Sequence, residues 1–157
     1  MAEPKDESIE AFRCRILTPA AAVFDQNVTR VEVTGVAGTM EILPRHEAFM
    51  SPLAMGTASA FLPGNPNPVL FAILGGFLDM DGDEATILAD AAERADHIDV
   101  GRAREALDRA KDRLTEAANL GTDVSKMDVD RAKLAMIRAL TRIRVTEDAV
   151  RPLTQGK

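Results

Sequence analysis

The chain has 157 residues, of which 46% are hydrophobic, with a formal net charge of −6 and one cysteine. This length suits one domain, or a compact domain with a helical appendage. The acidic balance and the lack of a basic block argue against a nucleic-acid-binding protein and against binding to an anionic membrane. Because Cys14 stands alone, an internal disulfide and a multi-cysteine zinc site are excluded.

The sequence carries no targeting signal and no membrane-spanning segment that we recognise. The polar stretch 1–11 resembles neither a signal peptide nor a transit peptide, and we interpret it as a disordered N-terminal extension. The longest apolar run, Val69–Leu78, is too short to cross a bilayer and contains two glycines. We therefore expect a soluble protein that meets a membrane only through a partner, with no direct insertion.

The first half of the chain alternates apolar and polar residues with period two, which is typical of strands with one buried face. In Arg30–Thr34, for example, Val31 and Val33 share one face. Strands are predicted at 12–17, 30–34, 57–62 and 84–90, and turn signals lie at 18–21, 24–27, 36–39, 43–46, 63–68 and 81–84. Residues 12–96 are therefore predicted to form an antiparallel β-sandwich or barrel. We interpret the acidic run 79–84 as a hairpin turn rather than a calcium loop, because it lacks the bidentate Glu at the twelfth loop position.

After His97 the spacing of apolar residues changes to steps of three and four, which predicts an antiparallel helical hairpin over 97–157. The helices are expected at about 102–118 and 128–150, with Gly121 after the first, Ser125 or Asp128 capping the second, and Pro152 ending it. The predicted facing stripes are Ala103, Ala106, Leu107, Ala110, Leu114, Ala117 and Ala118, and Ala132, Ala135, Met136, Ala139, Leu140 and Ile143. Because alanine buries little apolar area, we expect the hairpin to dock weakly and to be able to move.

No arrangement typical of an independent enzyme is present in the sequence. The phosphate-binding loop motif is missing, and no nucleophile–base set stands out. His46 and His97 lie far apart without neighbouring metal ligands, so we interpret each as structural or exposed and expect no metal site. We therefore expect a non-catalytic protein.

The stretch HIDVGRA, at 97–103, has two interpretations. In the first it is only a helix start: Asp99 is a favoured N-cap, and Ile98 can pack against Ala103 or the stem of Arg102. Arg102 fits this first interpretation poorly, because the helix dipole disfavours a cation in the first turn of a helix. The second interpretation is that the stretch forms half of a nucleotide site.

Two stretches resemble the epsilon subunit of F-type ATP synthases. VEVTGVAGTMEILPRHEAF at 31–49 is similar to that family's V-T-G-x-x-G-x-x-x-I-x-P-x-H pattern. LGGFLDMDGDEATILADAAERADHID at 74–99 is similar to its glycine pair, hairpin and V-T-[V/I]-L-A-D-x-A-x-R-A pattern. The matching positions are Val33, Thr34, Gly35, Gly38, Ile42, Pro44, His46, Gly75, Gly76, Thr86, Leu88, Ala89, Asp90, Ala92, Arg94 and Ala95.

The resemblance implies a non-catalytic central-stalk subunit of a proton-translocating F-type ATP synthase. Such a subunit lies peripherally on the cytoplasmic face of the bacterial inner membrane. Its sandwich would bind the gamma subunit and rest on the ring of c subunits. Its hairpin would either fold against the sandwich or extend into the alpha/beta catalytic head and restrain ATP hydrolysis. No cofactor is required.

The resemblance also implies a regulatory ligand, ATP. Some bacterial members bind ATP through I/L-D-x-x-R-A, which the stretch Ile98–Ala103 matches in full. The family's site also uses a Glu six residues before the Asp and arginines of both helices. The candidate nucleotide-binding residues are therefore Glu93, Ile98, Asp99, Arg102, Ala103, Arg109, Arg138 and Arg142. ATP would favour the folded hairpin and oppose the inhibitory one.

The region that faces the c ring in the family departs from its pattern at two places. The family usually has Gly-Glu-Leu-Gly where this chain has GTME at 38–41, and Pro-Gly-His where it has PRH at 44–46. The acid is displaced and a base is added, so the polar contacts to the ring are expected to differ. The candidate c-ring-facing residues are Gly38, Thr39, Glu41, Arg45 and His46.

Two functional hypotheses from different classes remain open. A rotor subunit should expose an apolar patch on the sandwich for the gamma subunit. The alternative, a free-standing β-sandwich ligand-binding module, should self-associate through the alanine stripe of its hairpin. Co-purification of a partner would separate the two.

Overall fold

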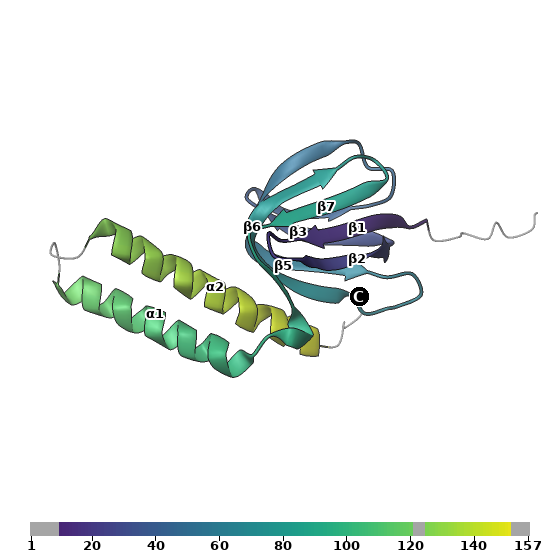
Figure 1. Cartoon of the computed structure of the whole chain (residues 1–157). Helices are drawn as coiled ribbons and strands as arrows, with labels where there is room; N and C mark the ends of the chain where they lie inside the picture. Colours follow the sequence, from purple (N-terminus) through teal and green to yellow (C-terminus); the bar gives the residue numbers. More distant parts are fainter. Residues whose placement is uncertain (1–9, 121–124, 152–157) are drawn as a thin grey trace, which may run out of the picture.

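The computed structural model describes residues 10–120 and 125–151, which form an eight-stranded β-sandwich followed by two antiparallel helices (Figure 1). The strands are β1 (Phe12–Leu17), β2 (Ala22–Val28), β3 (Arg30–Gly35), β4 (Gly38–Ile42), β5 (Phe49–Phe61), β6 (Val69–Met80), β7 (Glu84–Ala89) and β8 (Ala92–Arg94). A short 3-10 helix, η1 (Ala95–His97), leads to α1 (Val100–Leu120) and α2 (Lys126–Val150). The predicted fold class is confirmed.

The strands pair in the order β2-β1-β7-β6-β5-β3-β4, and β8 adds to β6. β1 runs parallel to β7, whereas the other pairs are antiparallel. β6 is therefore the central strand, since it pairs with β5, β7 and β8. Its Gly76 adopts a φ of +125°, and a Cβ at this position would collide with the Leu88 carbonyl oxygen.

The residues that the period-two alternation predicts to face the core are buried in the structure. Phe12, Cys14 and Ile16 of β1 point into the core, and so do Val31 and Val33 of β3. In the same core the rings of Phe24 and Phe71 pack edge to face, with centroids 5.2 Å apart. Burial raises the pKa of the Cys14 thiol to about 12, so this cysteine is a small apolar side chain at neutral pH.

Two predictions about the strands are wrong. Residues 24–27, expected to be a turn, lie inside β2, which is an edge strand paired only with β1. Its polar Asp25 and Asn27 are exposed, and only Phe24 and Val28 are buried, so its composition resembles that of a turn. The strand expected at 57–62 begins at Phe49 and includes a proline at position 52, which lies beyond the stretch paired with β3.

The predicted turns at 63–68 and 81–84 join β5 to β6 and β6 to β7. In the second turn the Asp81 carboxylate accepts the backbone N–H groups of Asp83 and Glu84, at 3.3 and 3.0 Å. This is the hydrogen bonding of a hairpin turn, as the sequence analysis proposed.

The two helices pack against each other through small side chains. Ala103 and Ala110 of α1 and Ala132 and Ala139 of α2 are buried, as predicted, whereas Ala118 and Leu140 of the predicted stripes are exposed. Ser125 caps α2, because its Oγ accepts the backbone N–H of Asp128 at 3.2 Å. The predicted roles of Gly121 and Pro152 lie outside the described residues.

The hairpin contacts the sandwich through α2, which lies beside β5, β6 and η1, and projects away from the sheet towards its tip (Figure 1). Beside the C-terminal half of α2 a groove of about 450 Å³ lies between the helix and the strands β3 and β5. Ile137 and Leu140 line this groove and are 42% and 45% exposed. The apolar contact between the hairpin and the sandwich is therefore concentrated near the C-terminal end of α2.

Candidate functional site

The residues of the predicted nucleotide site begin at the junction between sandwich and hairpin. Glu93 lies on β8, which pairs with β6, and Ile98 follows η1. Ile98 is 9% exposed and packs with Ala72, Ala95 and Val145. The junction is thus a small hydrophobic cluster between β6, η1 and α2.

Asp99 caps the first helix, as one of the two interpretations of HIDVGRA required. Its Oδ1 accepts the backbone N–H of Arg102 at 3.0 Å, and its carbonyl accepts that of Ala103 at 3.0 Å. The Arg102 side chain is 87% exposed, and its Nε lies 3.4 Å from Asp99 Oδ2. A neighbouring carboxylate thus offsets the unfavourable interaction of this cation with the helix dipole.

The arginines of the predicted site have different surroundings. Arg142 is half-buried and donates from Nε and Nη2 to Glu93 Oε1, at 2.9 and 2.5 Å. Arg109 lies 3.7 Å from Glu105 of its own helix, and Arg138 is exposed. The structure therefore brings Glu93 and Arg142 together and leaves Arg102 and Arg109 with local carboxylates.

The predicted c-ring-facing residues occupy β4 and the turn after it. Gly38 adopts a φ of 133°, and Thr39 and Glu41 are exposed on β4. Arg45 adopts a left-handed φ of 59°, which favours the glycine that the family usually has there. The His46 ring stacks at a tilt on Phe49, with centroids 4.8 Å apart.

Arg45 is paired with the segment that precedes β1. Its Nε and Nη2 donate to the two carboxylate oxygens of Glu10, at 2.6 and 2.5 Å. These hydrogen bonds lower the pKa of the Glu10 carboxyl. The base that distinguishes this loop from the family pattern is therefore neutralised by an acid of the same chain.

An exposed apolar row, which the amino-acid sequence alone does not locate, crosses the outer face of the sheet. Leu17, Leu88, Phe77 and Pro52 are successive cross-strand partners on β1, β7, β6 and β5. Val36 extends the row, because its N–H donates to the Pro52 carbonyl. Phe77, Leu88 and Val36 are 50%, 46% and 66% exposed. Alternation within β6 and β7 would have placed Phe77 and Leu88 outward, but only the pairing shows that they are neighbours.

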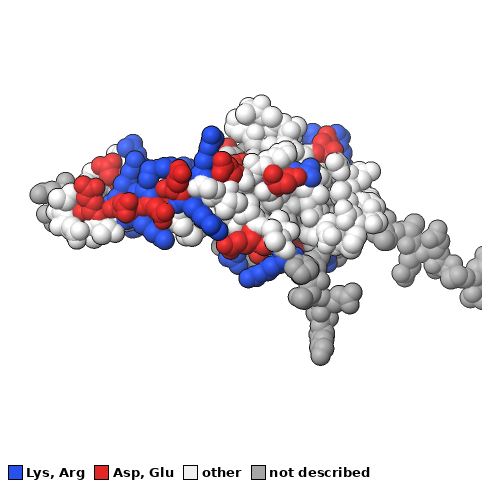
Figure 2. All heavy atoms as spheres, turned by 90° about the horizontal axis from the view of Figure 1, so that it is seen from below, with Lys and Arg blue, Asp and Glu red and all other residues white. Residues whose placement is uncertain are grey.

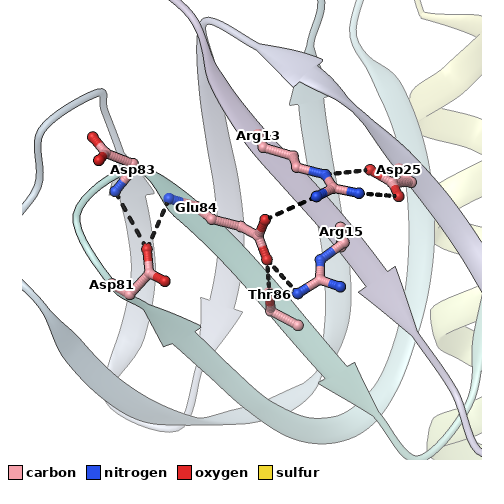
Figure 3. Close-up of polar contacts among 7 residues, drawn as sticks. All are labelled: Arg13, Arg15, Asp25, Asp81, Asp83, Glu84 and Thr86. Carbon is pink, nitrogen blue, oxygen red and sulfur yellow. Dashed lines mark hydrogen bonds and ion pairs between the residues drawn. The ribbon is translucent and has the colours of Figure 1, made fainter.

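Beside this row, the outer face of β1, β2 and β7 carries an ion-pair network (Figure 3). Arg13 binds Asp25 through two hydrogen bonds of 2.8 Å, which lower the pKa of the Asp25 carboxyl. Glu84 contacts both Arg13 and Arg15. The charges on this face are therefore mutually neutralised at its β1–β2 edge.

Charges on the hairpin are interleaved by sign, and Figure 2 shows no broad region of one sign on the face that it presents. Within the described residues, no group of acidic, histidine or cysteine side chains is arranged to hold a metal ion. None of the described helices is long and apolar enough to cross a membrane.

Two family models match consecutive parts of the chain. The first, the β-sandwich domain of the ATP synthase delta/epsilon chain, matches residues 11–95. The second, the long alpha-helix domain of the same chain, matches residues 96–147.

Relatives and solved structures agree with these matches. The ATP synthase epsilon chain of Nitratidesulfovibrio vulgaris (strain DP4) is 36% identical over 140 residues, covering 89% of this chain and 98% of that protein. That of Lacticaseibacillus casei (strain BL23) is 35% identical over 140 residues, covering 88% and 96%. A chain in the Euglena gracilis mitochondrial ATP synthase structure (OSCP/F1/c-ring) has the same fold, with a TM-score of 0.69, 18% identity and coverage of 96% and 89%.

Proposed function

The chain belongs to the delta/epsilon family of ATP synthase subunits, and we propose that it acts as the non-catalytic epsilon subunit of the central stalk. In this role it couples the gamma subunit to the c ring of a proton-translocating enzyme. The related epsilon chains come from bacteria, which supports a peripheral location on the cytoplasmic face of the bacterial inner membrane.

The observation that carries this proposal is the apolar row of Leu17, Leu88, Phe77, Pro52 and Val36. A contiguous exposed apolar strip on a sheet is characteristic of a protein-binding surface. The strip lies on β1, β7, β6 and β5, away from the groove that α2 borders on β3 and β5. We assign it to the gamma subunit, and the turn around Arg45 and His46 to the c ring.

The hairpin is proposed to restrain ATP hydrolysis when it extends into the alpha/beta head. Support comes from its shallow attachment: the apolar contact of α2 with the sheet is concentrated around Val145, and a groove borders Ile137 and Leu140. An element attached in this way can separate from the sandwich without exposing the main core.

The alternative, a self-associating ligand-binding module, is less well supported. It needs the alanine stripe as a contact surface for a second copy. Ala103 and Ala110 are already buried in the hairpin, as are Ala132 and Ala139. Self-association would therefore need another surface.

Replacing Phe77 with Asp should prevent co-purification of the gamma subunit with the tagged chain. The substitution puts a charge at the centre of the apolar row, and loss of a central aromatic contact commonly weakens binding by about tenfold or more. Met127→Asp is the matched control, because Met127 is also exposed but lies on α2. Capture of gamma by Phe77→Asp at the wild-type level would contradict the assignment.

A chain that ends at Asp96 should assemble into the enzyme and raise its rate of ATP hydrolysis. The reason is that the sandwich, with its apolar row, stays while the inhibitory helices are removed. Subunit content on a gel and the hydrolysis rate are measured on the same preparation. An unchanged rate in a fully assembled enzyme would mean that the hairpin does not inhibit.

ATP is proposed as the regulatory ligand of the folded hairpin. Arg102 and Arg109 are exposed and lie seven residues apart, so both guanidiniums lie near one line along α1. Charge-assisted hydrogen bonds from such side chains suit a triphosphate. Because Glu93 already holds Arg142, ATP would compete with a carboxylate for that guanidinium.

Calorimetric titration of the full chain with ATP tests this proposal. Arg102→Ala should weaken binding by about tenfold or more, since a hydrogen bond to a charged group is removed. Arg104→Ala, an exposed arginine outside the motif, should bind as the wild type does. The absence of a heat signal at millimolar ATP would contradict the proposal, and HIDVGRA would then be only a capped helix start.

A further inference from the structure

We propose that the Glu93–Arg142 ion pair is a nucleotide-independent latch that holds the hairpin folded on the sandwich. The two residues are 49 positions apart in sequence and come from different parts of the fold, β8 and α2. The bond therefore joins the two parts directly. The latch concerns the position of the hairpin, and only its consequence for hydrolysis rests on the inhibitory function proposed above.

The geometry and burial of the pair suit this role. Arg142 donates from two nitrogens to one carboxylate oxygen, at 2.9 and 2.5 Å. The side chains are only 27% and 38% exposed, so solvent and salt screen the pair less than the other ion pairs of the hairpin. Arg102, by comparison, is 87% exposed beside Asp99.

The latch adjoins the apolar anchor of the hairpin. Val145 follows Arg142 by three residues, so the two side chains share a face of α2. Val145 is fully buried and packs with Ala72, Ala95 and Ile98. Ala72 is also the cross-strand partner of Glu93. Both the ion pair and the packing of Val145 therefore depend on the pairing of β6 with β8, so each contact helps to hold the other in place.

Elsewhere along α2 the apolar contact with the sandwich is looser. The groove between α2 and the strands β3 and β5 leaves Ile137 and Leu140 nearly half exposed. The folded position thus depends mainly on a few residues near one end of α2. Loss of the ion pair should shift the population towards a detached hairpin.

Hydrogen exchange measured by mass spectrometry on the full chain tests the latch. Glu93→Gln and Arg142→Gln should each speed exchange in residues 139–147 by about tenfold or more, the factor expected for loss of a charge-assisted bond. A detached alanine-rich hairpin is marginally stable, so its amides exchange faster. The double variant Glu93→Arg with Arg142→Glu exchanges the two charges and should recover part of the protection of residues 139–147 from exchange.

Controls separate the latch from general loosening. Asp25→Asn removes a sandwich ion pair of comparable geometry, with Arg13, and should leave exchange in 139–147 unchanged. Exchange in β1 and β7 reports whether each variant keeps its fold. Wild-type exchange in both single variants would overturn the latch. So would protection of 139–147 in the wild type that appears only when ATP is added.

The same variants in the assembled enzyme distinguish the latch from the proposed inhibition. If a detached hairpin inhibits, Glu93→Gln should lower the hydrolysis rate. Faster exchange with an unchanged rate would support the latch and contradict the inhibitory function, whereas unchanged exchange would overturn the latch whatever the rate.

Discussion

The attachment of the hairpin depends on the Val145 side chain, which packs in a small hydrophobic cluster with Ala72, Ala95 and Ile98. Ala72 lies on β6, the central strand of the sandwich, whereas Ala95 begins the short 3-10 helix that follows β8, and Ile98 comes directly after that helix. Because the contact is small, the sandwich keeps its own core of strand residues independent of the helices. The sandwich therefore does not rely on the helices for its core, and this is the condition that the proposed detachment of the hairpin requires.

The outer surface of the sandwich also differs from that of the hairpin. One region of the sheet carries the apolar row around Phe77 and Leu88, and the β1–β2 edge beside it is neutralised by the Arg13–Asp25 pair. The β4–β5 turn carries Arg45, whose charge Glu10 balances. The hairpin, by contrast, is covered with interleaved charges (Figure 2). A surface organised in this way allows the sandwich to be bound on one side while the hairpin stays solvated.

Local patterns in the sequence predicted much of this fold. Alternation located β1, β3 and β7, and capping chemistry located Asp99 and Ser125. The pattern failed at β2, an edge strand with polar exposed residues, and at the start of β5, where a proline interrupts it. Period and spacing could not predict the Glu93–Arg142 pair, the burial of Val145 or the apolar row, because each depends on residues that only tertiary pairing brings together. The candidate ATP-binding residues were likewise identified from the family motif, and not from the period or the spacing of apolar residues.

The most direct test of the account is a distance measured in the assembled ATP synthase between spin labels on the sandwich and the hairpin. Gln26→Cys and Lys133→Cys provide exposed labelling positions, and buried Cys14, with its raised pKa, should not compete. We expect one distance in the isolated chain and a second, different distance in the assembled enzyme without ATP. A single unchanged distance under both conditions would contradict a hairpin that detaches from the sandwich.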